Sequence, residues 1–251
     1  MLPAEEFSRT DRKLMNSQFS RFAKTKGVML AADLRSEKDL RHLLDQVGDY
    51  VDVVKLGNSL LYMCGAPLIG RLKTHYSLPI VADLKLTDVS HIATRVVRLF
   101  RDEGADAVIL TGLCGSEVLR DAVEEGGSCC EIWAFTEFTH DSGLIDVQLA
   151  NQTVRTATRS GVVGLQVPGT RPFRIEDVRT DVGEDIAIVA CGIGMQGGRF
   201  GSAIAAGANL EIIGRAIYAT PSPQEAAEAA RRAIRQTPND TSVDTTKLRE
   251  S

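Results

Sequence analysis

The stretch PIVADLKLTD, residues 79–88, joins an apolar run to a cluster of charges at its end. The apolar part is nearly continuous, which is typical of a parallel β-strand buried on both faces. Asp83, Lys85 and Asp88 then follow one another closely. Because side chains two residues apart in a strand point to the same face, we expect Asp83 and Lys85 to project together. The segment therefore predicts a buried strand that ends in charged groups.

Seven further apolar runs of this kind occur, and a segment of helical character follows nearly every one. Such alternation predicts a parallel α/β fold, and eight strands are the number that closes a (β/α)8 TIM barrel. A doubly wound open sheet is the alternative, but no GxGxxG follows the first strand. The further runs are VMLAAD (28–33), VDVVKLG (51–57), DAVILTG (106–112), EIWAFTE (131–137), VVGLQVP (162–168), AIVACG (187–192) and LEIIGR (210–215).

The chain divides into three parts by composition. Residues 1–26 are polar and weakly helical, and we expect a leader on the domain surface. Residues 27–236 form the predicted barrel domain. Residues 237–251 are polar without periodicity and are predicted to be a disordered tail.

Overall composition narrows the classes of partner. The net charge is −4 without a basic block, so nucleic acid is not an expected partner. No apolar run reaches the roughly 18 residues of a membrane span. The five cysteines show no framework spacing, which favours reduced thiols in a cytoplasmic protein. Cys129 and Cys130 are adjacent, but no other Cys or His stands nearby at ligand spacing, so we expect no metal site.

Charged residues stand at the ends of the first three predicted strands. The first ends in Asp33, the second carries Lys55 and the third carries Asp83 and Lys85, with Asp88 opening the next helix. In a TIM barrel the chemistry is located at these carboxyl ends. Opposite charges within about 4–6 Å favour the ionised forms, so we expect both lysines to be ammonium groups. The simpler interpretation is that Asp88 is a helix N-cap and that Asp33 and Lys55 form an ordinary ion pair.

The last two strands end differently. GIGMQGGRFG (192–201) follows the seventh and Gly214-Arg215 the eighth, where this fold usually binds phosphate. Backbone N–H groups of glycines and a planar guanidinium both suit phosphate oxygens. We therefore expect a phosphorylated small molecule across the barrel mouth, contacted in its middle by residues that follow the fifth strand. These are Thr136, Glu137, Thr139 and His140, although a surface role for His140 is equally open.

The motifs, taken in order, resemble the orotidine 5′-monophosphate decarboxylase family, and its archaeal-type branch more than its fungal one. The resemblance covers residues 28 to about 235. It implies decarboxylation of orotidine 5′-monophosphate to uridine 5′-monophosphate in de novo pyrimidine biosynthesis, without a cofactor. The motifs are LAAD (30–33), VVKLG (53–57), VADLKLTD (81–88), GADAVILTG (104–112), TEFTH (136–140), PGTRP (168–172), GIGMQGG (192–198) and IIGRAIY (212–218).

The resemblance also implies a role for each charged residue. Lys85 would protonate the C6 carbanion that remains when CO₂ departs, and Asp83 would lie against the substrate carboxylate. Asp33 and Lys55 would hold the ribose hydroxyls. Asp88 would reach into the site of the neighbouring subunit, which implies a homodimer with shared active sites.

The remaining roles concern the base and the phosphate. Thr139 stands where the family has a serine that recognises the pyrimidine. Gln196 would bridge base and phosphate from a closing loop, and Arg215 would clamp the phosphate with the backbone of Gly214. Two further glycines are assigned to the substrate-binding loop, Gly194 and Gly197.

One position departs from the family pattern DxKxxDIxxT. Ile92 stands at the place of the threonine, and Thr94 comes two residues too late. An apolar residue there is similar to the sister group, 3-keto-L-gulonate 6-phosphate decarboxylase and hexulose-phosphate synthase. These sugar-phosphate decarboxylases and aldolases use Mg²⁺ and carry an acid where this chain has Lys55, so they are the second hypothesis. A barrel that binds a nucleotide without turnover is the third.

Overall fold

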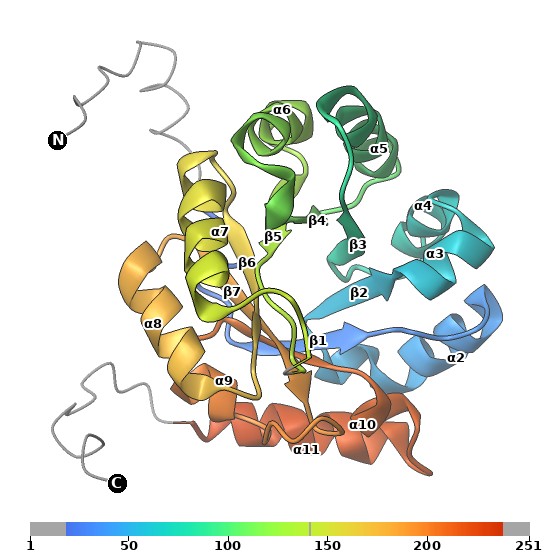
Figure 1. Cartoon of the computed structure of the whole chain (residues 1–251). Helices are drawn as coiled ribbons and strands as arrows, with labels where there is room; N and C mark the ends of the chain where they lie inside the picture. Colours follow the sequence, from blue (N-terminus) through green and yellow to red (C-terminus); the bar gives the residue numbers. More distant parts are fainter. Residues whose placement is uncertain (1–18, 141, 238–251) are drawn as a thin grey trace, which may run out of the picture.

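Eight parallel strands form a closed barrel in the order β1 to β8 (Figure 1). The computed structural model describes residues 19–140 and 142–237, so residues 1–18 of the predicted leader and 238–251 of the predicted tail lie outside it. The prediction of a TIM barrel is confirmed. The strands are β1 (Gly27–Ala31), β2 (Val53–Gly57), β3 (Ile80–Leu86), β4 (Ala107–Thr111), β5 (Glu131–Phe135), β6 (Gly164–Pro168), β7 (Ala187–Ile193) and β8 (Leu210–Ile213).

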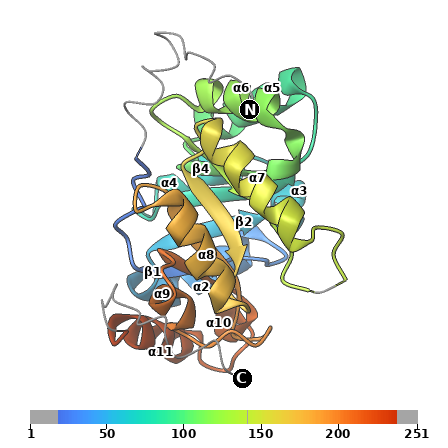
Figure 2. The same cartoon turned by 60° about the vertical axis from the view of Figure 1, so that its left-hand side comes forward.

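Helices cover the outside of the barrel in both views (Figure 1, Figure 2). Ser36 caps the first of them by accepting a hydrogen bond from the Asp39 N–H at 3.1 Å. None of the helices in the described part of the chain is long and apolar enough to cross a membrane. They are α2 (Glu37–Val47), α3 (Asn58–Cys64), α4 (Pro67–Lys73), α5 (Ser90–Asp102), α6 (Ser116–Gly126), α7 (Val147–Arg159), α8 (Pro172–Val182), α9 (Ser202–Ala205), α10 (Arg215–Tyr218) and α11 (Pro223–Arg235), with two short 3-10 turns, η1 (Gly48–Tyr50) and η2 (Gly112–Cys114).

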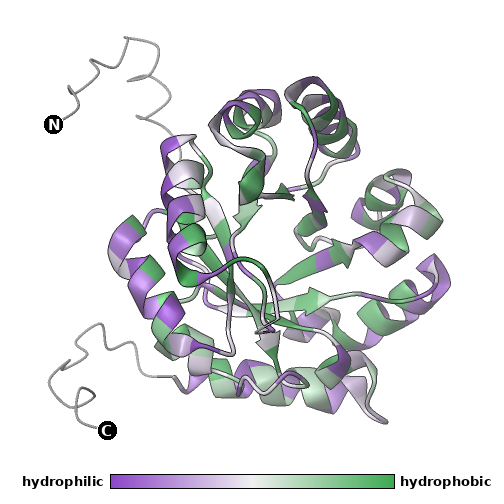
Figure 3. Ribbon diagram, in the orientation of Figure 1, coloured by the Kyte–Doolittle hydropathy of each residue, from purple (hydrophilic) through white to green (hydrophobic). Residues whose placement is uncertain are grey.

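The core has two layers because each strand is buried on both faces. The outer layer lies between strands and helices, and the apolar sides of the helices face the barrel (Figure 3). The inner layer fills the barrel itself with residues such as Met29, Ile109 and Trp133. The barrel interior is therefore a packed core, and at the carboxyl ends of the strands this core forms the floor of the barrel mouth.

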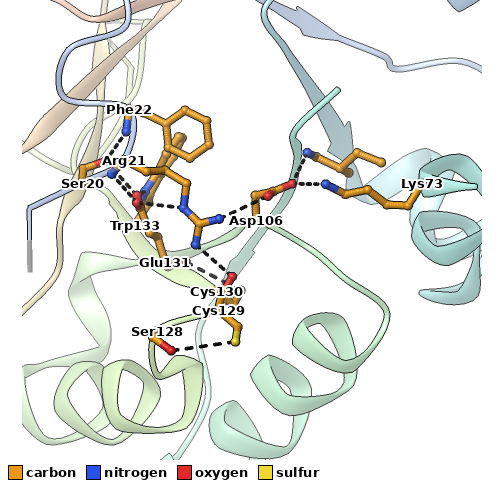
Figure 4. A network of polar contacts seen from close by, with 11 residues as sticks. Ser20, Arg21, Phe22, Lys73, Asp106, Ser128, Cys129, Cys130, Glu131 and Trp133 are labelled. Carbon is orange, nitrogen blue, oxygen red and sulfur yellow. Dashed lines mark hydrogen bonds and ion pairs between the residues drawn. The ribbon is translucent and has the colours of Figure 1, made fainter. Parts of the chain in front are cut away.

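A short N-terminal segment closes the opposite end of the barrel (Figure 4). Phe22 is 3% exposed and packs edge-on against Trp133, with 5.2 Å between the ring centroids. Arg21 forms ion pairs with Asp106 and Glu131, both at 3.3 Å. The sequence predicts a surface leader here, whereas Phe22 belongs to the inner core. Residues 19–26 are thus part of the folded unit.

Candidate active site

The carboxyl ends of the strands surround a cavity of about 240 Å³. Its walls come from β1, β2 and β3 on one side and from the segments that follow β5, β7 and β8 on the other. Three of the predicted site residues, Asp88, Gly194 and Gly197, are not among its lining residues. The predicted residues that the fold brings together here are Asp33, Lys55, Asp83, Lys85, Thr139, Gln196, Gly214 and Arg215.

Asp83 is the centre of a compact charged group. Its side chain is buried, with Lys55 Nζ 3.1 Å from Oδ2 and Lys85 Nζ 2.7 Å from both carboxylate oxygens. The register of β2 and β3 pairs Gly57 with Asp83 and brings the lysine of the preceding strand alongside. A Cβ at Gly57 would lie 2.3 Å from Asp33 Oδ1, so this glycine leaves room for the second aspartate.

The charges of this group stabilise one another. Burial alone would raise the pKa of Asp83, but Lys55 and Lys85 outweigh it and hold that pKa below its usual range. Burial alone would lower the pKa of Lys55, but Asp83 and Asp33 raise it above the usual range. At neutral pH the site therefore holds an ionised Asp83 and a positively charged Lys55.

Lys85 reaches Asp83 through an irregular backbone. The pairing of β3 with β4 shifts register between Asp83 and Leu86. Lys85 has φ 44°, and among residues 19–140 and 142–237 it is the only non-glycine residue with positive φ. This left-handed conformation costs roughly 1–2 kcal/mol for a residue with a Cβ. Such strain is typical of functional positions, and here it accompanies the bidentate contact with Asp83.

The loop after β7 is built from glycines in conformations that other residues avoid. Gly194 has φ 84° and Gly197 has φ 104°. The loop is tied by a hydrogen bond from the Gly194 N–H to the Gly198 carbonyl at 2.7 Å. Gly194 and Gly197 thus shape the loop that presents Gln196 to the cavity, although neither lines the cavity itself.

Glu211 fixes the far end of this loop and was not predicted. It is fully buried on β8 and accepts hydrogen bonds from the N–H groups of Gly201 and Ala203, both at 2.9 Å. Burial raises the pKa of this carboxyl group, although these N–H groups oppose that shift. The sequence offered one signal, because a glutamate inside the apolar run LEIIGR needs an internal partner.

Arg215 provides a positive charge at the other side of the mouth. It begins α10 directly after Gly214, and its side chain is exposed. Within the described part of the chain, its guanidinium forms no hydrogen bond or ion pair. It is therefore available to an anionic ligand, and Gly214 lines the cavity beside it.

Asp88 lies outside the cavity. It is exposed, and its Oδ1 accepts a hydrogen bond from the Val89 N–H at 2.8 Å. The N-cap of α5 is Val89, and no side chain caps this helix. Asp88 is therefore not the N-cap that the simpler interpretation suggested. Ile92 lies one turn further along, half-buried on α5.

Of the four residues predicted to contact the ligand after β5, Thr139 lines the cavity, as does its neighbour Phe138. The Thr136 hydroxyl donates to the Gln166 carbonyl at 2.9 Å, inside the protein. Glu137 forms a buried ion pair with Arg174 at 3.0 Å. The expectation that Thr136 and Glu137 contact the ligand is therefore wrong, because both support the strand ends instead. His140 is exposed, and its ring stacks on that of Phe138 with 5.0 Å between the ring centroids.

Several lining residues were missed by the sequence analysis. Phe135 and Gln166 face each other across the pairing of β5 and β6, and Cys191 and Tyr218 complete the walls. Burial raises the pKa of Cys191 to about 11, so its thiol is protonated at neutral pH. Gln166 carried a signal, because it is the polar residue within the apolar run VVGLQVP.

Comparison with known proteins gives a consistent result. A sequence model of the orotidine 5′-phosphate decarboxylase / HUMPS family matches residues 26–230. The orotidine 5′-phosphate decarboxylase of Pyrococcus horikoshii is 36% identical over 203 residues, which is 80% of this chain and 96% of the relative. That of Methanosarcina mazei is 31% identical over 202 residues, 80% of this chain and 91% of the relative.

Solved structures agree with the sequence comparison. The crystal structure of the Pyrococcus horikoshii enzyme superposes with a TM-score of 0.74 at 34% identity, and the match covers 83% of this chain and 99% of the other. The enzyme from Methanocaldococcus jannaschii, complexed with the inhibitor BMP, superposes with a TM-score of 0.76 at 25% identity over 84% and 99% of the two chains.

Proposed function

This chain belongs to the orotidine 5′-phosphate decarboxylase / HUMPS family, and on that premise we propose that it converts orotidine 5′-phosphate to uridine 5′-phosphate and CO₂. It is a carboxy-lyase of pyrimidine biosynthesis. The observation that carries this proposal is the position of Asp83, an ionised carboxylate buried between two lysines in a cavity whose other side presents Arg215.

The geometry suits a decarboxylation that forms a carbanion. The substrate carboxylate lies against Asp83, and the repulsion between the two anions is relieved when CO₂ leaves. The C6–carboxyl bond breaks and its electron pair stays on C6. Lys85 stabilises this charge and then donates a proton from Nζ to C6. Asp33 and Lys55 bind the ribose hydroxyls.

The opposite side of the cavity anchors the substrate. Arg215 and the backbone of Gly214 hold the phosphate, Thr139 contacts the pyrimidine, and Gln196 joins base and phosphate from the loop shaped by Gly194 and Gly197. Binding energy from the remote phosphate is then available to close the site around the reacting carbon.

Lys55 also separates this proposal from the Mg²⁺-dependent sugar-phosphate reactions of the sister group. Its ammonium group lies 3.1 Å from Asp83 Oδ2, where a divalent cation would be repelled. The matched relatives described above are orotidine 5′-phosphate decarboxylases. We therefore expect turnover without a metal ion.

The activity assay is direct. Orotidine 5′-phosphate is added to purified protein in excess EDTA, and the loss of its absorbance is followed against Lys85→Ala, which lacks the proton donor. Turnover by the wild type and a rate at least about 10²-fold lower for the variant are expected. If only a sugar phosphate is consumed, and only with Mg²⁺, the sister-group reaction replaces this proposal.

We further propose a homodimer with shared active sites. Apolar side chains are exposed after three consecutive strands: Tyr62 is 82% exposed on α3, Val89 56% before α5 and Leu113 47% in η2. Consecutive strands are neighbours in the barrel, so these residues gather on one side of the mouth. Asp88 adjoins Val89 and faces outward. A second copy on this surface would cover the apolar side chains and receive Asp88.

Mixed dimers test the shared site. Lys85→Ala and Asp88→Ala subunits, each inactive alone, are combined and allowed to exchange. If Asp88 serves the neighbouring subunit, one site of each mixed dimer carries both substitutions and the other carries neither, so activity returns. If Asp88 acts within its own subunit, every site keeps one lesion and no activity returns.

The barrel over residues 27–236, together with the segment that closes its N-terminal end, is the proposed catalytic unit. We place it in the cytoplasm. All five cysteines are free, as is usual for proteins of reducing compartments.

A further inference from the structure

Gln166 is a polar residue inside the barrel whose side-chain amide is only partly hydrogen-bonded. It lies in the middle of β6, where its neighbours across the sheet are Phe135 on β5 and Val189 on β7. Its side chain is only 2% exposed, yet it belongs to the lining of the catalytic cavity. A buried polar side chain without full hydrogen bonding usually has a functional reason.

Both ends of the Gln166 amide are poorly satisfied. Nε2 faces Asp83 Oδ2 at 3.4 Å, longer than an ordinary N–H···O hydrogen bond. The two lysines hold the same carboxylate at 2.7 and 3.1 Å, so Asp83 does not depend on Gln166. Oε1 is buried and accepts no hydrogen bond from any described residue. The protein thus supplies a donor beside Asp83 that it does not itself use fully.

The chemistry of the site indicates which group this donor serves. In the proposed function, on which this inference rests, the substrate carboxylate lies against Asp83. We propose that Gln166 is a specificity-determining residue that donates a hydrogen bond from Nε2 to the carboxylate of the substrate. One amide then faces two carboxylates, Asp83 and the substrate. Because Asp83 is already paired with Lys55 and Lys85, the second anion is the one that lacks a donor.

The contact distinguishes substrate from product. A carboxylate accepts a charge-assisted hydrogen bond, which is about twice as strong as a neutral one. The carboxylate leaves as uncharged CO₂, and uridine 5′-phosphate has only a hydrogen at C6. The donor therefore favours the bound substrate over both the transition state and the product. Gln166 should tighten substrate binding without increasing the rate of the chemical step.

Binding measurements in an inactive background isolate this contact. Calorimetric titrations compare orotidine 5′-phosphate with uridine 5′-phosphate on Lys85→Ala and on Lys85→Ala with Gln166→Leu. Leucine keeps a similar volume without the donor. We expect substrate binding to weaken at least about 10-fold and product binding to change less than about 2-fold. Equal weakening of both ligands, or unchanged substrate affinity, overturns the proposal.

A second variant provides a pH signature that a packing effect would not produce. Gln166→Glu keeps the shape but is an anion at neutral pH and a donor when protonated. Its substrate-to-product affinity ratio should lie below that of Gln166→Leu at neutral pH and rise above it in acid. In the Lys85→Ala background, the charged and titratable groups that line the cavity on the side of position 166 are Lys55, Asp83 and Cys191, and they are the same in both variants. Identical ratios at every pH contradict the proposed donor.

Two controls separate this inference from the proposed function. Gln46→Leu, at a half-buried position of α2 that does not line the catalytic cavity, should leave the affinity ratio unchanged. In the active enzyme, Gln166→Leu should raise KM about 10-fold or more while kcat does not fall, and a kcat loss at unchanged KM refutes the role. If the wild type fails to decarboxylate, the proposed function fails, while the binding ratios still measure Gln166 directly.

Discussion

Replacing Lys85 by glycine or by alanine separates its backbone strain from its chemistry. Both substitutions remove the ammonium group and its 2.7 Å contacts with Asp83. They differ at the backbone, because position 85 has φ 44°. Alanine must keep a Cβ in this left-handed conformation, whereas glycine adopts it freely. The difference in stability between the two variants therefore reports the strain at this position.

Its magnitude follows from two opposing contributions. A non-glycine residue in the left-handed region costs roughly 1–2 kcal/mol. Glycine makes the unfolded chain more flexible, which costs roughly 0.4–1 kcal/mol in the opposite direction. With the midpoints of these ranges, about 1.5 and 0.7 kcal/mol, Lys85→Gly should have a free energy of unfolding about 0.8 kcal/mol higher than Lys85→Ala. In a chain of this length that corresponds to a melting temperature about 1–4 °C higher.

The assay is parallel thermal and urea unfolding of the two variants, with decarboxylation measured on the same samples. Neither variant should turn over substrate, because neither carries a proton donor at position 85. As a matched control, Ser90→Gly and Ser90→Ala, at the first residue of α5, should show the opposite order, since glycine is unfavourable in a helix. A Lys85→Gly protein that is less stable than Lys85→Ala by roughly 0.4–1 kcal/mol, the difference expected from the unfolded chain alone, would show that position 85 carries no strain.

Three further substitutions test the charges and the proposed interface. Arg215→Ala should raise KM for the nucleotide about 10-fold or more, the loss expected for a hydrogen bond to a charged group; the nucleoside orotidine should be unaffected, and a large effect on it would place Arg215 away from the phosphate. Burial would raise the pKa of Asp83, but Lys55 and Lys85 hold that pKa below its usual range, so the ionised form stabilises the fold. The wild type should therefore exceed Asp83→Asn in unfolding free energy by a constant amount above about pH 4, and this excess should disappear as the pH falls through the lowered pKa. A difference that does not depend on pH would contradict this. Ile92→Thr should keep the proposed dimer and strengthen nucleotide binding by about 1 kcal/mol, the contribution of a new hydroxyl contact with the ribose. Dissociation into monomers would show that the apolar contact of Ile92 matters more.

The barrel and the charged side of its mouth were predictable because each rests on a local pattern. Each of the eight strands overlaps one of the apolar runs, since strands buried on both faces cannot carry many polar residues. The few charges at the ends of such runs, Asp33, Lys55 and Asp83, must then meet at one rim. The register of the parallel strands then sets which of these residues are neighbours, and it places Gly57 beside Asp83.

The missed features depend on contacts between distant segments. The register shift between Asp83 and Leu86 could not be predicted. It includes the positive φ of Lys85, and lysine is not a residue type that favours this conformation. Glu211 and Gln166 were visible as polar residues in apolar runs, but their partners lie in other segments of the chain. The burial of Phe22 depends on its contact with Trp133 inside the barrel, more than a hundred residues further along the chain.

The two ends of the barrel divide stability and function between them. At the mouth, Lys85 is held in an unfavourable conformation and the buried Oε1 of Gln166 accepts no hydrogen bond from any described residue, so this end is destabilised where the ligand binds. At the other end, Arg21 joins the starts of β4 and β5 through Asp106 and Glu131, and Lys73 pairs with Asp106 at 2.5 Å (Figure 4). These ion pairs fix strand ends that carry no proposed chemistry. The same network reaches β3, which carries Lys85, because the Ile80 N–H at the start of that strand donates a hydrogen bond to Asp106 at 2.7 Å. Strain at Lys85 can therefore persist, because the opposite end of its strand is fixed.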